Sequence, residues 1–166
     1  MKRLSFSVGL VLVTLAAALC LAPSATAGTP VPHKESADGQ TVLVINPTLQ
    51  NPLGTFQWTA QGIATQMGKY TEAGSHNFTA PNAQGVGLVL NGTFTSTAAD
   101  GSTISGTYSG TYKILGGNQV SYSVTVVWLT GTGRLAGVTG RSPVTALLNT
   151  TTGKFHFDGV GTWILP

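Results

Sequence analysis

Three groups of residues have types and spacings that could carry chemistry. The segment "GTGRLA", residues 131–136, satisfies the G-x-G-x-x-G/A pattern of dinucleotide-binding loops, in which glycines permit a tight turn and the N-terminus of the next helix holds the pyrophosphate. Tyr70 and Glu72 are two residues apart, and so are His156 and Asp158. Because residues two apart in a strand share a face, each pair could act as a general acid and a general base.

The nucleotide interpretation requires a helix after the glycines and then a parallel strand, a unit of roughly 30 residues. Only 29 residues follow Gly137, and Gly140 and Pro143 would interrupt a helix among them. Their alternation of apolar and polar residues is typical of two antiparallel strands. The sequence therefore argues against a nucleotide site, and the glycines need another explanation.

The elements that position these residues are predicted to be strands. From residue 55 onward apolar and polar residues alternate with period two, as in residues 86–97, where the apolar set includes Leu88 and Phe94. No segment of this region shows a convincing helical period. So many strands form either a sandwich or a barrel, and glycines on the apolar faces favour the barrel. We therefore predict an all-β fold, a single antiparallel β-barrel of about eight strands.

The N-terminus has the features of a cleavable signal peptide. Lys2 and Arg3 precede an apolar run of 15 residues and the small-residue site "ATA", which ends at Ala27. A helix that spans a membrane needs roughly 20 apolar residues, so removal is the interpretation that we adopt. An uncleaved anchor and a lipid-modified Cys20 are the alternatives.

This interpretation divides the chain into three parts. Residues 1–27 are the predicted signal peptide, residues 28–40 are rich in Pro, Gly and charge and are predicted to be a flexible leader, and residues 41–166 are the predicted barrel domain. A protein exported in this way is secreted, or lies in the periplasm or the cell envelope.

Composition argues against several classes of partner. Without residues 1–27 the chain carries six basic and five acidic side chains, and no cluster of Lys or Arg that would bind nucleic acid. Cys20 is the only cysteine and the three histidines are scattered, so we expect no metal site and no cofactor. We also expect no membrane span after removal of the signal peptide.

The segment "LTGTGRLAGVTG" (129–140) resembles the "GGTGRFAGATG" type of segment in the barrel superfamily of allene oxide cyclases and dirigent proteins, and in exported bacterial barrels similar to them. Residues 62–78 and 97–110 resemble the same group, in the same order, and the resemblance covers roughly residues 55–163. It implies an eight-stranded antiparallel barrel with an apolar and aromatic interior. It implies no single reaction, because members range from cyclisation of a fatty-acid epoxide to steering of radical coupling. Relatives assemble, which leaves homo-oligomers open.

Structural and binding roles follow from this barrel. We predict that the glycine segment forms a tight corner between two strands, in which Arg134 bonds exposed carbonyl groups. The residues of this corner are Gly131, Gly133, Arg134, Gly137 and Gly140. Six aromatic residues are predicted to line a ligand cavity, with a fully packed core as the alternative. They are Trp58, Tyr108, Tyr112, Tyr122, Trp128 and Phe157.

Two functions remain open. The first is an exported, non-catalytic barrel that binds a small hydrophobic ligand, with no catalytic residue assigned. The alternative is an isomerase or cyclase that acts on a hydrophobic substrate, in which Tyr70 and Glu72 would polarise the substrate and Glu72 must point inward. His156 and Asp158 are predicted to lie on the outer face, in solvent.

Overall fold

The computed structural model describes residues 28–45 and 52–166, and the predicted signal peptide lies outside them. This part of the chain forms eight strands and one short 3-10 turn. The strands are β1 (Thr29–Ile45), β2 (Gly54–Ala64), β3 (Gly68–Phe78), β4 (Val86–Ala98), β5 (Thr103–Gly116), β6 (Gln119–Gly131), β7 (Thr139–Asn149) and β8 (Lys154–Leu165), with the 3-10 turn η1 (Gly133–Leu135) between β6 and β7.

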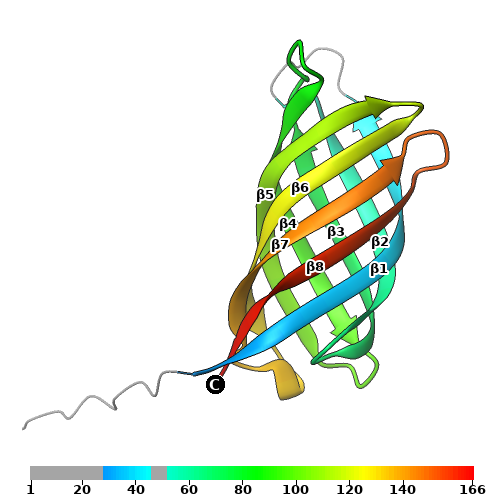
Figure 1. The fold of residues 1–166 in the computed structure, drawn as a ribbon. Coiled ribbons are helices and arrows are strands. Elements are labelled where there is room, and N and C mark those ends of the chain that lie inside the picture. The colour runs from blue at the N-terminus through cyan, green and yellow to red at the C-terminus, as the bar shows by residue number, and fades with distance from the viewer. Residues whose placement is uncertain (1–27, 46–51) are drawn as a thin grey trace, which may run out of the picture.

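The strands form a closed barrel in which each pairs antiparallel with its neighbours in the sequence, and β1 pairs with β8 (Figure 1). The predicted all-β antiparallel barrel is therefore confirmed. Closure pairs most of each strand on both edges, which suits a Thr-rich sheet that has few charged residues to protect an edge.

The prediction that residues 28–40 form a flexible leader is wrong. Residues from Thr29 onward belong to β1, which pairs with β8 from Thr29 to Gln40 and with β2 from Glu35 to Ile45. The composition of this segment misled the prediction because β1 directs polar residues inward. His33 is fully buried and the Glu35 side chain is 8% exposed. The barrel domain thus begins at Thr29 rather than at residue 41.

Glycines on the inner face lie opposite aromatic residues of the neighbouring strand. Gly74 pairs with Trp58, and a Cβ atom at Gly74 would lie 2.5 Å from the indole ring. Gly92 has the same relation to Tyr108. Each ring therefore lies over a glycine backbone, which allows a narrow barrel to hold several aromatic side chains.

A bulge in β4 changes the predicted face of its first residues. The pairing of β4 with β5 shifts between Val89 and Gly92, and Asn91 has a positive φ of 52°. As a result Leu88 is exposed and Val89 is buried on the inner face with Phe94. Strict alternation across the bulge predicted the opposite orientation for Leu88, because one inserted residue reverses the faces of everything before it.

A compact cluster of aromatic rings, the plug, lies inside the end of the barrel that holds the C-terminus, which is the lower end in Figure 1. The His33 ring stacks on Trp163 with centroids 4.3 Å apart, and Trp128 meets both rings edge-on. All three side chains are almost fully buried. Any cavity inside the barrel therefore lies between the plug and the upper end.

Candidate functional site

A cavity of about 100 Å³ lies inside the barrel. Every strand contributes to its wall, which is mostly apolar. Seven of the lining residues are Phe, Trp or Tyr. These are Phe56, Trp58, Phe94, Tyr108, Tyr122, Phe155 and Phe157. Aliphatic side chains of β6 and β7, such as Val126 and Val144, complete the wall. Apart from Thr41, the polar residues of the lining lie in two groups.

The first group is a pair of buried carboxyl groups. Glu72 of β3 and Glu35 of β1 both point inward and line the cavity. Glu72 is 8% exposed, and its Oε2 accepts a hydrogen bond of 2.7 Å from the Ser96 hydroxyl. Burial and, to a lesser extent, the negative charge of Glu35 together raise the pKa of Glu72 to about 8, although the Ser96 hydrogen bond acts in the opposite direction. At neutral pH Glu72 is therefore mainly a neutral acid that can donate a proton.

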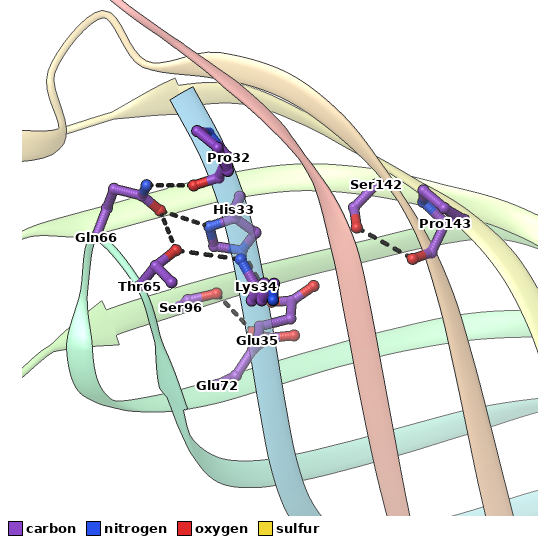
Figure 2. A network of polar contacts seen from close by, with 10 residues as sticks. All are labelled: Pro32, His33, Lys34, Glu35, Thr65, Gln66, Glu72, Ser96, Ser142 and Pro143. Carbon is purple, nitrogen blue, oxygen red and sulfur yellow. Dashed lines mark hydrogen bonds and ion pairs between the residues drawn. The ribbon is translucent and has the colours of Figure 1, made fainter. Parts of the chain in front are cut away.

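His33 lies near this pair and contacts Gln66 (Figure 2). Gln66 Nε2 donates to the Pro32 carbonyl, so Gln66 Oε1 accepts at 2.9 Å from Nδ1 of His33. The other ring nitrogen, Nε2, faces Glu35 Oε2 at 3.6 Å and has no hydrogen-bond partner. Since Nδ1 donates to Gln66, Nε2 is the ring nitrogen that faces Glu35.

The second group is a chain of hydrogen bonds through three aromatic rings. Trp58 Nε1 donates to Tyr108 Oη at 2.7 Å, and Tyr108 Oη lies 2.8 Å from His76 Nδ1. An indole nitrogen can only donate, so the tyrosine hydroxyl is free to donate to His76 Nδ1, and the proton of the neutral imidazole is then on Nε2. Burial lowers the pKa of His76 to about 4, so the ring is neutral at pH 7. His76 Nε2 is buried without a partner.

The structure brings together four of the six aromatic residues predicted to line a cavity, namely Trp58, Tyr108, Tyr122 and Phe157. The other two lie elsewhere. Trp128 belongs to the plug, and Tyr112 donates from its hydroxyl to the Thr79 carbonyl at 2.7 Å, close to the upper end. Sequence alternation identifies the inner face of a strand, but it does not tell how far along the barrel axis a side chain lies.

The structure places Tyr70 and Glu72, which the sequence predicts to act as a pair, in different surroundings. Both side chains are buried, but only Glu72 lines the cavity. Tyr70 lines a different pocket, whose wall includes exposed residues such as Asp38, Gln61 and Lys69. Burial raises the pKa of Tyr70 well above its usual range, with a contribution from the charge of Glu72, and its hydroxyl has no partner. Tyr70 is thus a neighbour of the acid pair outside the cavity.

His156 and Asp158 lie on the outer face, as predicted. His156 Nδ1 is 2.9 Å from Asp38 Oδ1, and Nε2 is 3.2 Å from Asp158 Oδ2. The hydrogen bond to Asp38 raises the pKa of His156, and the charge of Asp158 adds to the effect. Asp38 and His156 are direct partners across the β1–β8 seam, so this cluster stabilises barrel closure and has no access to the cavity.

The glycine segment forms the corner between β6 and β7. Gly133 and Gly137 have positive φ values of 58° and 78°, Gly131 ends β6, and Gly140 lies in β7 opposite Trp163. Its single 3-10 turn provides no helix N-terminus for a pyrophosphate, in agreement with the argument against a nucleotide site.

Arg134 ties this corner to two other turns at the same end of the barrel. Its guanidinium donates to the carbonyls of Gln66 and Met67, in the β2–β3 turn, and to the Asp100 carboxylate, in the β4–β5 turn. The carbonyls therefore belong to a neighbouring turn rather than to the glycine segment itself. Each of the three guanidinium nitrogens donates to a different acceptor, whereas the three donors of a lysine lie on a single nitrogen and cannot reach acceptors so far apart.

Sequence reasoning missed Glu35, His33 and His76. The first two fall in the segment that was predicted to be a leader, although "HKESADG" does alternate in the register of β1. His76 follows Tyr70, Glu72 and Gly74 at a spacing of two, so the same alternation could have placed it on the inner face. Alternation identifies an inner face by its apolar side chains, and at these positions the inner face carries polar side chains instead.

No group of three or more His, Cys, Asp or Glu side chains in residues 28–45 and 52–166 could hold a metal ion. The same residues contain no helix that is long and apolar enough to cross a membrane.

Comparisons with known proteins give one likeness in fold. No protein-family model matches the sequence, and a search of curated proteins finds no match. Among solved structures, the barrel is similar to the pterocarpan synthase dirigent protein PsPTS1, with a TM-score of 0.49 and 15% sequence identity over 84% of this chain and 97% of that chain. The glycine segment resembles the superfamily that contains dirigent proteins, and the predicted closeness to exported bacterial barrels stays a prediction.

Proposed function

We propose that the protein binds one small, predominantly apolar molecule inside the barrel. The observation that carries this proposal is the cavity of about 100 Å³, whose wall is aromatic and aliphatic apart from a few polar groups. Ligand sites in proteins have this composition, in which an apolar wall supplies affinity and a few polar groups orient the ligand. A cavity of roughly 150 Å³ admits benzene, so a cavity of about 100 Å³ suits a ligand of at most one ring, and a substituent on that ring requires the surrounding side chains to move. The N-terminal sequence supports a location outside the cytoplasm.

A cavity-filling variant tests this proposal. Ala146 lines the cavity from β7, whereas Ala73 is exposed on the outside of β3. We expect Ala146→Leu to weaken the binding of small aromatic ligands at least tenfold, measured by calorimetry or by Trp58 fluorescence, and Ala73→Leu to leave binding unchanged. Native mass spectrometry of the purified protein should also recover a bound apolar molecule. Equal ligand affinity in the wild type and in Ala146→Leu would show that the cavity is not the site.

A second candidate function is an isomerase or cyclase that acts on a hydrophobic substrate. It is favoured by Glu72, which lines the cavity and has a pKa of about 8, a suitable value for a general acid near neutral pH. Turnover by this route would decline as pH rises through about 8. Glu72→Gln would abolish turnover while the substrate still binds, and turnover that persists in Glu72→Gln would exclude this role for the carboxyl group.

A further inference from the structure

The proposed function leaves the class of ligand open, and the polar groups of the cavity narrow it. We propose that the ligand is a small organic amine whose ammonium group lies between Glu35 and Glu72 and whose apolar body packs against the aromatic wall. This inference rests on the proposed function, because it concerns the same cavity.

The first argument is the charge inside the cavity. Glu35 and Glu72 both line it, and no Lys or Arg is among the lining residues in the described part of the chain. The one basic group near the pair is His33, whose Nε2 faces Glu35 and not the cavity wall. A buried carboxylate is costly unless a partner compensates its charge. A cationic ligand compensates Glu72 directly, whereas a neutral ligand leaves both carboxyl groups as they are and an anionic ligand is repelled.

The second argument is the aromatic wall. An ammonium group attached to an apolar body is attracted by the faces of aromatic rings, most strongly by Trp, and this attraction increases when water is excluded. Trp58, Phe56 and Tyr122 are among the rings that face the cavity. The same wall accepts the hydrocarbon part of an amine by ordinary apolar contact. The carboxyl groups thus favour the ammonium group of an amine, and the aromatic wall favours its hydrocarbon part.

The third argument is an independent polar group that lacks a partner. His76 is 7% exposed, lines the cavity, and holds its Nε2 buried without a hydrogen bond. The chain from Trp58 through Tyr108 leaves this nitrogen as a donor, so it calls for an acceptor from a ligand. His76 lies four residues along β3 from Glu72, so this nitrogen is a second polar position in the cavity, separate from the carboxyl pair.

Protonation links amine binding to pH. The groups that face Glu72 are Glu35 from β1, Tyr70 on its own strand and Ser96 from β4, while His33 faces Glu35. Free Glu72 is mostly protonated at pH 7, because burial raises its pKa to about 8. An ammonium ion favours the carboxylate, so binding must release a proton from Glu72. A neutral ligand releases none.

Three probes of equal size separate the ligand classes: benzylamine, benzyl alcohol and benzoate. We expect the wild-type protein to bind benzylamine at least about tenfold more tightly than benzyl alcohol at pH 8, and benzoate more weakly than both. Calorimetry at pH 7 in two buffers of different ionisation enthalpy should show release of up to about one proton per bound amine. The amine affinity should increase between about pH 6 and 8.5, and the alcohol affinity should stay constant.

Matched variants assign the effect to the carboxyl pair. Glu72→Gln keeps the shape of the side chain and should remove the preference for the amine and its proton release, with the alcohol affinity unchanged. Asp158→Asn removes a carboxylate on the outer face and should leave both effects intact. Glu35→Gln is a second test of the pair if Glu72→Gln does not fold.

The outcomes distinguish this inference from the proposed function. If benzyl alcohol or benzoate binds as tightly as benzylamine, the amine inference is overturned while binding in the cavity stands. An amine preference that survives in both Glu72→Gln and Glu35→Gln also overturns it. If none of the three probes binds, both the inference and the proposed binding of a ligand of this size fail.

Discussion

At the scale of single residues, Glu72 couples the interior of the barrel to pH. In the unfolded chain a glutamate has a pKa of about 4.3, whereas burial raises the pKa of Glu72 to about 8 in the folded protein. The folded state therefore holds this proton more tightly than the unfolded state. The resulting stabilisation is complete below about pH 4 and is lost as pH rises toward 8, which is the opposite of a carboxylate in a salt bridge.

Glu72→Gln removes this dependence, because an amide is neutral at every pH. Relative to the wild type, we expect the variant to gain stability as pH rises, by on the order of 3 to 5 kcal/mol at about pH 9. Urea unfolding at about pH 5 and pH 9 measures this difference. Asp158→Asn, on the outer face, is the control. A constant difference between wild type and Glu72→Gln at the two pH values would mean that the Glu72 carboxyl is not perturbed by burial.

At the scale of elements, the seam between β1 and β8 carries a titratable contact. His156 of β8 and Asp38 of β1 are direct partners, and the hydrogen bond between them raises the pKa of His156. A raised histidine pKa gives stability that is complete below the unfolded value of about 6.5 and is lost as pH rises through the folded value. The histidine side chain is 49% exposed, so solvent screens the interaction.

We therefore expect His156→Gln to lower stability at about pH 5.5 by less than about 1 kcal/mol, and to have no effect at about pH 9. Thermal unfolding at the two pH values checks the direction. In an Asp38→Asn background most of the effect at low pH should disappear, because Asp38 makes the main contact. A larger effect of His156→Gln at high pH than at low pH would contradict the assignment.

Individual strands also show what the sequence could predict. Alternation identified the inner faces of β5, β6 and β8, because their inward residues are apolar and their outward residues are polar. It failed in β4, where a bulge at Asn91 reverses the faces, and a single inserted residue leaves no trace in composition. It failed again in β1, where the inner face carries His33 and Glu35. The aromatic part of the cavity was therefore predictable, and half of its acid pair was not.

At the scale of the whole molecule, closure and plugging together create the site. The plug of His33, Trp128 and Trp163 fills the lower end, so side chains above it must fill or leave open the rest of the interior. Glycines such as Gly74 let rings lie close to the barrel wall, and this arrangement leaves a cavity beside them. The interior of a barrel with eight strands is just wide enough for this result. The position of a cavity therefore depends on all strands, and no local pattern contains it.

Deletion of residues 28–40, the segment that the sequence predicts to be a leader, is the most direct test of the whole barrel. β1 pairs with β8 along Thr29 to Gln40, and it supplies both Glu35 and the plug residue His33. A chain that starts at Thr41 would leave β8 paired with β7 alone and would open the interior to water. We expect this chain to aggregate or to lack a cooperative thermal transition, whereas a chain that starts at Gly28 unfolds cooperatively. Near-ultraviolet circular dichroism and size-exclusion chromatography measure the difference, and a synthetic peptide of residues 28–45 should restore folded protein when it is added during refolding. If the chain from Thr41 unfolds at the same temperature as the chain from Gly28, residues 28–40 are dispensable and the closed barrel does not depend on them.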